Sequence, residues 1–272
     1  MSKLGDKNVL ITGAASGIGR LMAHKISAHG AHIIAWDINA AGLEALRSEL
    51  EAKDRKISTY VCNIAERETI YATAQQVLDS HQVVDVLINN AGIVQGKSIL
   101  EASDEAIIRT FDVNTLSLFW MTRAFMPAMI TKGSGHIVTV ASAGGIVGTA
   151  KLTDYCASKF GAVGFDESLR LEMQRQKLNI KTTVVCPFYI DTGMFAGVKS
   201  RFGWFLPILK PENVADKVVK AIQRNDQRAI LPWTVKLIYP LRLLPVGLAD
   251  GIMGIIGINR TMDDFTGRQG NH

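Results

Sequence analysis

Apolar, strand-like segments alternate with helical segments along most of this 272-residue chain. The first strand-like segment, Asn8–Thr12, is followed by residues 18–29, whose apolar positions recur at helical spacing. Further strands are predicted at 31–36, 57–62, 83–89, 135–140, 180–186 and 227–231. Further helices are predicted at 42–52, 67–80, 105–131, 153–176 and 211–224. Continuously apolar strands alternating with helices indicate a parallel sheet covered on both faces. The pattern therefore predicts an α/β fold, a doubly wound parallel sheet in a Rossmann-type three-layer sandwich.

No internal repeat, low-complexity segment or Pro/Ser-rich linker interrupts this alternation. We therefore expect a single domain at residues 1–232 with a C-terminal extension at 233–272. Since 47% of the residues are hydrophobic and 20% are charged, the composition excludes a disordered chain.

The net charge of +5 is unevenly distributed. Residues 1–198 are neutral, with 19 basic and 19 acidic residues, whereas 199–242 hold nine basic and three acidic ones. A nucleic-acid-binding chain would spread or concentrate its charge far more, so we expect no nucleic acid partner.

The three cysteines, Cys62, Cys156 and Cys186, are widely spaced and form no C-x-x-C motif, which favours a reducing compartment. The six histidines show no metal-ligand spacing, so no metal site is expected. No apolar segment precedes the first strand, and we expect neither a signal peptide nor an N-terminal anchor.

A glycine-rich turn joins the first strand to the first helix. The turn has the pattern T-G-x-x-x-G-x-G, in which the glycines are Gly13, Gly17 and Gly19 and Ser16 lies directly before the second glycine. Glycines there allow close backbone approach, and the helix N-terminus offers free N–H groups to a pyrophosphate. We interpret the turn as a dinucleotide site, the alternative being a purely structural strand-to-helix turn.

Asp37 ends the second strand, 18 residues after Gly19. An acidic side chain at this place accepts hydrogen bonds from an adenosine ribose and repels a 2′-phosphate. No arginine follows it, so NAD is predicted over NADP. The alternative is a surface residue that caps the next helix.

Several motifs in order resemble the short-chain dehydrogenase/reductase family over roughly residues 5–230. They are the glycine turn, Asn89-Asn90-Ala91-Gly92, Asn114, Ser142 and Tyr155-Cys156-Ala157-Ser158-Lys159. Tyr155 and Lys159 are four residues apart on one predicted helix and face the same way. An ammonium one turn away favours the phenolate of a tyrosine.

The resemblance implies a catalytic role for four residues. Tyr155 would be the general acid/base, and Ser142 would orient the substrate oxygen. Lys159 would bind the nicotinamide ribose and lower the Tyr155 pKa, and Asn114 would hold a water in a proton relay. It also implies cofactor contacts from the glycine turn, the fourth strand and the segment after the sixth. These residues are Gly13, Ser16, Gly17, Ile18, Gly19, Asp37, Asn63, Ile64, Asn90, Ala91, Gly92, Tyr155, Lys159, Pro187, Ile190 and Thr192.

Asn63 departs from the family pattern, which has an aspartate that accepts from the adenine amino group. An asparagine carbonyl oxygen still accepts, so we expect the contact to persist without its charge.

The resemblance is strongest to the branch that acts on steroids, retinol-like and other lipophilic alcohols. In the family, the chain after Thr192 shapes specificity, and residues of about 193–210 are predicted to form an apolar substrate lid. The segment at 230–258 mixes aromatic, aliphatic and basic residues. It is interpreted as packing on the lid or on another subunit, as peripheral membrane contact, or as both.

The predicted function is thus NAD-dependent hydride transfer between nicotinamide and a lipophilic alcohol or ketone. One alternative is a 3-oxoacyl reductase that docks an acidic carrier protein on the basic stretch. The non-enzyme alternative is a dinucleotide-binding regulator at a lipid surface. From the resemblance we expect a homodimer or homotetramer paired through the helices near 105–131 and 153–176. The cysteine pattern and the lack of a signal peptide predict a cytoplasmic location, with peripheral membrane association as the open alternative.

Overall fold

A computed structural model describes residues 4–267 of the chain. Its centre is a seven-stranded parallel sheet with the strand order β3-β2-β1-β4-β5-β6-β7. The strands are β1 (Asn8–Thr12), β2 (His32–Asp37), β3 (Ile57–Val61), β4 (Val86–Asn89), β5 (Gly135–Val140), β6 (Ile180–Pro187) and β7 (Arg228–Leu231). The predicted α/β doubly wound sheet is confirmed. The order reverses between β1 and β4, and ligands of such sheets bind beside that reversal.

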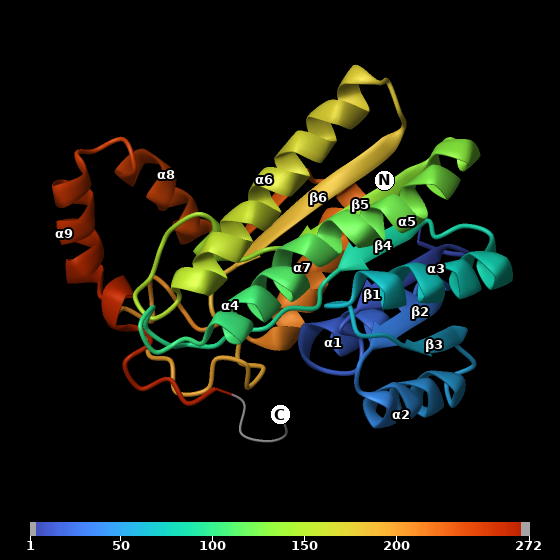
Figure 1. The fold of residues 1–272 in the computed structure, drawn as a ribbon, viewed down its shortest axis with the longest axis horizontal. Coiled ribbons are helices and arrows are strands. Elements are labelled where there is room, and N and C mark those ends of the chain that lie inside the picture. Colours follow the sequence, from blue (N-terminus) through green and yellow to red (C-terminus); the bar gives the residue numbers. More distant parts are fainter. Residues whose placement is uncertain (1–3, 268–272) are drawn as a thin grey trace.

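Two layers of helices cover the sheet (Figure 1). They are α1 (Gly17–Ser27), α2 (Ala40–Glu51), α3 (Arg67–His81), α4 (Asp104–Phe111), α5 (Ser117–Lys132), α6 (Thr153–Arg175) and α7 (Pro211–Arg224). Successive strand residues face opposite layers: Val9 and Ile11 pack with α1, α2 and α7, whereas Leu10 packs with α3, α5 and α6. This alternation explains why the strands are apolar throughout.

The helix predicted at 105–131 is not continuous. A π-helical turn, η1 (Asp112–Leu116), separates α4 from α5. Such a turn adds a residue to the helical repeat and re-aims the side chains that it carries. Here it brings Asn114 to face Ile93 and Ser158, as described below.

A third apolar cluster joins the C-terminal segment to the end of the sheet. This segment forms η3 (Trp233–Leu237), α8 (Ile238–Leu241), α9 (Val246–Ile256) and η4 (Ile258–Arg260). Val235, Ile238 and Met253 are buried against Ile230 and Leu206. In Figure 1, α8 and α9 stand apart from the two helix layers at one end of the molecule. The last residues of the predicted extension, 268–272, lie outside the described range, as do residues 1–3 of the main domain.

Candidate active site

One cavity of about 290 Å³ lies where the strand order reverses. The predicted site residues line it, except Gly19 and Asn114, which stand directly behind its wall. The lining residues are Gly13, Ser16, Gly17, Ile18, Asp37, Asn63, Ile64, Asn90, Ala91, Gly92, Ser142, Tyr155, Lys159, Pro187, Ile190 and Thr192. Residues far apart in the sequence are thus brought together as expected.

The glycine turn is too tight for side chains at two positions. Gly13 has a φ of +68°, and a Cβ there would lie 3.0 Å from the Cα of Ala91. A Cβ on Gly19 would lie 2.1 Å from the carbonyl oxygen of Gly13. The turn therefore brings the backbone to the cavity wall at the start of α1, where a helix favours a phosphate.

Thr12 fixes this turn to β4, a role that the sequence analysis missed. Its hydroxyl oxygen accepts from the backbone N–H groups of Asn90, at 3.0 Å, and Ala91, at 3.1 Å. The Asn90 amide also donates to the Thr12 carbonyl at 2.9 Å. The only sequence signal for this contact was the threonine placed directly before the first glycine.

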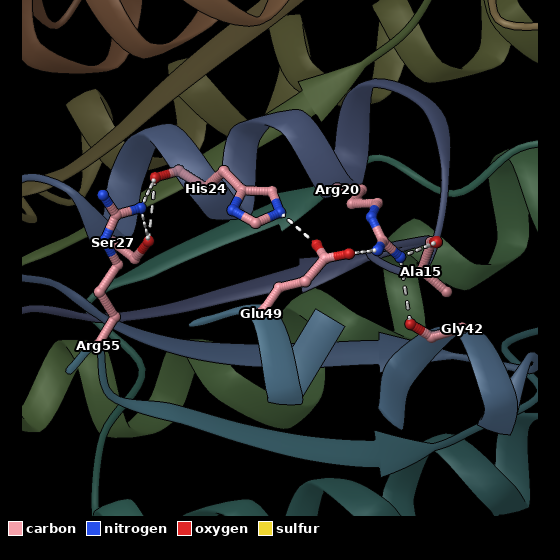
Figure 2. Close-up of polar contacts among 7 residues, drawn as sticks. All are labelled: Ala15, Arg20, His24, Ser27, Gly42, Glu49 and Arg55. Carbon is pink, nitrogen blue, oxygen red and sulfur yellow. Dashed lines mark hydrogen bonds and ion pairs between the residues drawn. The ribbon is translucent and has the colours of Figure 1, made fainter. Parts of the chain in front are cut away.

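A polar network on α1 and α2 supports the same turn from outside (Figure 2). Arg20 donates to the carbonyl oxygens of Ala15, at 3.3 Å, and Gly42, at 3.4 Å. Glu49 on α2 receives both Arg20, at 2.5 Å, and His24, at 2.9 Å. Arg20 thereby joins the glycine turn to the start and the end of α2.

Asp37 faces the cavity from the end of β2. Its carboxylate accepts from the backbone N–H of Ala15 at 2.9 Å and of Asn39 at 3.0 Å. Asn39, not Asp37, is the N-cap of α2, because its side chain accepts from the Gly42 N–H at 3.0 Å. Asp37 is therefore held beside the glycine turn, which argues against the alternative of a capping residue.

Asn63 lines the cavity with both side-chain groups already engaged. Its amide nitrogen donates to Glu66 at 2.7 Å, and its carbonyl oxygen accepts from the Ala65 N–H at 3.2 Å. Since a carbonyl oxygen has two lone pairs, one acceptor position remains for an adenine amino group.

Tyr155, Ser142 and Lys159 gather at the other end of the cavity. The Tyr155 side chain hydrogen-bonds Ser142, whose hydroxyl oxygen accepts from the Gly144 N–H at 3.0 Å. The Lys159 ammonium donates to the Val140 carbonyl at 3.0 Å and lies 5.8 Å from the centre of the Tyr155 ring. All three side chains are thus oriented by the end of β5 and the first turns of α6.

Burial dominates the pKa values of this pair. It lowers the pKa of Lys159 to about 8. Burial raises the pKa of Tyr155, and the hydrogen bond with Ser142 offsets only part of that increase. The sequence analysis expected the neighbouring ammonium to lower the Tyr155 pKa. In the protein without cofactor the pKa of Tyr155 is raised overall, because burial disfavours the phenolate, and the lowering by Lys159 stays a prediction.

Asn114 is buried behind Gly92. Its carbonyl oxygen accepts from the Ile93 N–H, and its amide donates to the Ile93 carbonyl, both at 2.9 Å. The amide also reaches the Ser158 hydroxyl at 3.0 Å. A Cβ on Gly92 would lie 3.2 Å from Asn114 and 3.3 Å from the Lys159 ammonium, so Asn114 and Lys159 flank the same glycine.

Most of the remaining wall of the cavity is apolar, apart from Arg109 and Thr149, and part of it comes from the C-terminal segment. Leu206 of the predicted lid contributes, together with Val235, Ile238 and Ile258. Phe195 packs edge-on against Tyr155, with ring centres 5.7 Å apart. The contribution of 235–258 to the cavity was not predicted, because nothing local in the sequence marks a distant segment as a wall.

These residues fit a nicotinamide dinucleotide. The glycine turn excludes side chains beside the N-terminus of α1, and the carboxylate of Asp37 beside it can accept from a hydroxyl group. Asn90 adds a buried carbonyl oxygen without a hydrogen-bond partner among the described residues. Within residues 4–267, no group of three or more His, Cys, Asp or Glu side chains is arranged to hold a metal ion.

The profile of the family described as short chain dehydrogenase matches residues 7–201. The chain belongs to the short-chain dehydrogenase family. As a member of that family it is an oxidoreductase, which confirms the predicted family and enzyme class.

Curated relatives agree with this assignment. Member 6 of short-chain dehydrogenase/reductase family 16C from Bos taurus is 45% identical over 226 residues, 82% of this chain and 72% of that protein. Epidermal retinol dehydrogenase 2 from Homo sapiens is 42% identical over 264 residues, 94% of this chain and 84% of that protein. These relatives confirm the predicted resemblance to the branch that acts on retinol-like alcohols.

Two solved structures illustrate the fold. A short-chain dehydrogenase/reductase from Burkholderia phymatum in complex with NAD has a TM-score of 0.81 at 23% identity and covers 89% of this chain and 95% of its own. A metagenomic short-chain oxidoreductase in complex with NADP has a TM-score of 0.70 at 27% identity and covers 84% of this chain and 96% of its own. Similar structures thus occur with either cofactor.

Proposed function

We propose that this enzyme transfers hydride between NAD and a lipophilic alcohol or ketone. The observation that carries the proposal is the cavity itself: Tyr155, Ser142 and Lys159 stand at one end, and apolar side chains surround them. Such a site orients one polar group of the substrate and binds the rest by apolar contact.

The protein's own groups manage the proton. Ser142 orients the substrate oxygen, and Tyr155, hydrogen-bonded to Ser142, takes the hydroxyl proton in oxidation or returns it in reduction. Lys159 lies beside the Tyr155 ring and, with a pKa of about 8, exchanges protons near neutral pH. Asn114 and Gly92 form the wall behind Lys159, and Asn114 would hold the water of the proposed proton relay.

We infer NAD rather than NADP from the adenosine end of the cavity. The lining residues at the ends of β2 and β3 are Trp36, Asp37, Ile38, Cys62, Asn63 and Ile64, and none of these six is a cation, although Arg109 on α4 lines the same cavity. An anionic Asp37 without a cation in these two segments disfavours a 2′-phosphate. When bound, the nicotinamide supplies the position that accepts or donates hydride.

The substrate class follows from the apolar wall and from the relatives. Two relatives carry the name epidermal retinol dehydrogenase 2, and the wall formed by Leu206, Val235 and Ile238 suits an extended apolar molecule. We infer a retinoid, steroid or long-chain alcohol. Residues 1–232 then form the catalytic domain, and 193–210 act as its lid.

We also propose that the enzyme forms a homodimer or homotetramer. Exposed apolar side chains lie on the helices that the resemblance assigns to pairing. They are Ile108, Leu116, Phe119 and Leu171, which are 40–60% exposed. Light scattering on the purified chain would test the assembly.

A substrate screen tests the proposed function. NADH formation would be measured with retinoids, steroids, fatty alcohols and small secondary alcohols, each with NAD and NADP in parallel. We expect the highest kcat/KM for an apolar alcohol with NAD. A preference for 3-oxoacyl groups on a carrier protein, or for NADP, would contradict it.

A further inference from the structure

The outward face of the C-terminal segment is unusually apolar. We call this surface, together with Trp204 of the predicted lid, the apolar cap; its residues are Trp204, Trp233, Leu237, Tyr239, Leu243, Leu244, Val246, Leu248 and Ile255. Leu243 is 86% exposed, Trp204 84% and Val246 76%. Soluble chains seldom leave such a group uncovered unless it meets a partner.

The exposure does not come from a loosely attached segment. Val235, Ile238 and Met253 on the inward face are buried in the cluster at the end of the sheet. The Thr234 hydroxyl donates to the Phe205 carbonyl at 2.7 Å, and Arg201 donates to the Ile255 carbonyl at 3.1 Å. The segment is therefore packed by one face, and the other faces outward.

The charges beside the cap are mostly positive. Arg201, Lys236 and Arg242 are exposed, whereas Asp250 is the one acidic residue between 230 and 258. Within residues 4–267, none of these three cations lies within ion-pair distance of a carboxylate. Cations without carboxylate partners beside tryptophans and aliphatic side chains are typical of a surface that lies on anionic lipid.

None of the helices within residues 4–267 is long and apolar enough to cross a bilayer. A contact through the cap would therefore lie in the plane of the lipid surface. A second copy of the chain fits less well, because a two-fold contact through the cap would bring together two surfaces that each carry Arg201, Lys236 and Arg242.

We propose that the apolar cap docks the enzyme on the surface of an anionic lipid bilayer. Trp204, Trp233 and the aliphatic side chains enter the boundary between head groups and acyl chains, and the three cations contact anionic head groups. Because the same segment lines the cavity with Val235, Ile238 and Ile258, docking places the apolar wall of the cavity next to the lipid.

Sedimentation of the full chain with vesicles tests this surface. Vesicles of phosphatidylcholine with 30% phosphatidylglycerol are compared with vesicles of phosphatidylcholine alone. The wild type should bind the anionic vesicles more tightly. In the double variant Leu243→Glu/Val246→Glu, the partition coefficient should fall at least about tenfold, because two carboxylates would enter the apolar boundary.

A matched control carries the same change elsewhere. Ile99 and Leu100 are 56% and 96% exposed and do not line the cavity, so the partition coefficient of Ile99→Glu/Leu100→Glu should stay near the wild-type value.

A second pair of variants tests the cations. Lys236→Gln should reduce vesicle binding about fivefold, as expected for one cation at an anionic surface, whereas Lys181→Gln in β6 should change vesicle binding little. Thermal unfolding checks that each variant is folded.

Three results would overturn the proposal. They are no vesicle binding by the wild type, equal binding to both kinds of vesicle, and unchanged binding by Leu243→Glu/Val246→Glu. A change of oligomeric state in that variant without vesicles would assign the cap to a second copy instead. The readout is vesicle binding and not turnover, so this inference and the proposed reaction can fail separately.

Discussion

At the scale of single residues, the active site places an acid and a base in an environment that disfavours charge on both. Burial lowers the pKa of Lys159 to about 8 and raises that of Tyr155. The protein alone therefore keeps the Tyr155 phenol neutral. A positive charge that arrives with an oxidised cofactor would favour the phenolate, so we expect proton removal to be coupled to cofactor binding.

Removing the Tyr155 hydroxyl should nearly abolish turnover. Tyr155→Phe keeps the ring against Phe195 but loses the proton-transfer group, so we expect kcat to fall by about 10²–10⁴-fold. NADH fluorescence titration should show binding close to that of the wild type. Tyr60→Phe, which removes a hydroxyl on β3, is the matched control and should remain active. Full activity of Tyr155→Phe would refute its assignment.

Asp37 should control the choice of cofactor. Asp37→Ala removes a negative charge from the part of the cavity at the end of β2. The ratio of kcat/KM for NADP to that for NAD should rise by at least about tenfold. The control is Asp79→Ala on an exposed part of α3. An unchanged ratio, or a wild type that prefers NADP, would contradict the cofactor assignment.

At the scale of secondary structure, the sequence analysis predicted most of the sheet and the glycine turn. Asn8–Thr12, Gly135–Val140 and Pro211–Arg224 have the predicted bounds, because apolar periodicity, glycines and a helix-initiating proline mark them locally. The motifs at both ends of the cavity were also found, since each sits at the end of a strand or on one face of a helix.

Features that depend on distant packing escaped prediction. The π-helical turn η1 contains Asn114, whose amide donates to the Ile93 carbonyl and the Ser158 hydroxyl. These partners are distant in the sequence, so no local pattern predicts the turn. The wall supplied by Val235, Ile238 and Ile258 likewise depends on how the C-terminal segment folds back. The net rise of the Tyr155 pKa was likewise not predicted, because the burial of the phenol could not be read from the spacing of two residues.

Arg20 should link the packing of α1 and α2 to cofactor binding. Arg20→Gln removes its contacts with the Ala15 and Gly42 carbonyls and with Glu49, which together hold the glycine turn. We expect the NADH Kd to rise by about 3–10-fold, the loss typical of one or two hydrogen bonds. Arg47→Gln on α2 breaks an exposed pair with Glu44 only and should leave the Kd unchanged. Equal effects of the two variants would contradict this role.

At the scale of the whole molecule, a buried carboxyl makes folding depend on pH. Asp166 on α6 is 1% exposed, and burial raises its pKa from 3.8 to about 7, although a 3.4 Å hydrogen bond from Thr182 partly offsets this. Between these values the folded state binds more protons than the unfolded state. Its stability therefore falls as the pH rises through this window.

Asp166→Asn should remove this dependence. Between pH 5 and pH 8 the wild type should lose about 2–3 kcal/mol of unfolding free energy through Asp166, since each pKa unit corresponds to about 1.4 kcal/mol. Urea unfolding at both pH values measures the loss, with exposed Asp79→Asn as the control. The buried His136 acts in the opposite direction, because burial lowers its pKa from 6.5 to about 4 and only the unfolded state binds its proton near pH 5. The contribution of Asp166 is therefore read from the difference between the wild type and Asp166→Asn, in which the contribution of His136 cancels. If Asp166→Asn kept the wild-type slope, the buried carboxyl would not be the group that titrates, and the pH dependence would have to be sought in the surface ion pairs.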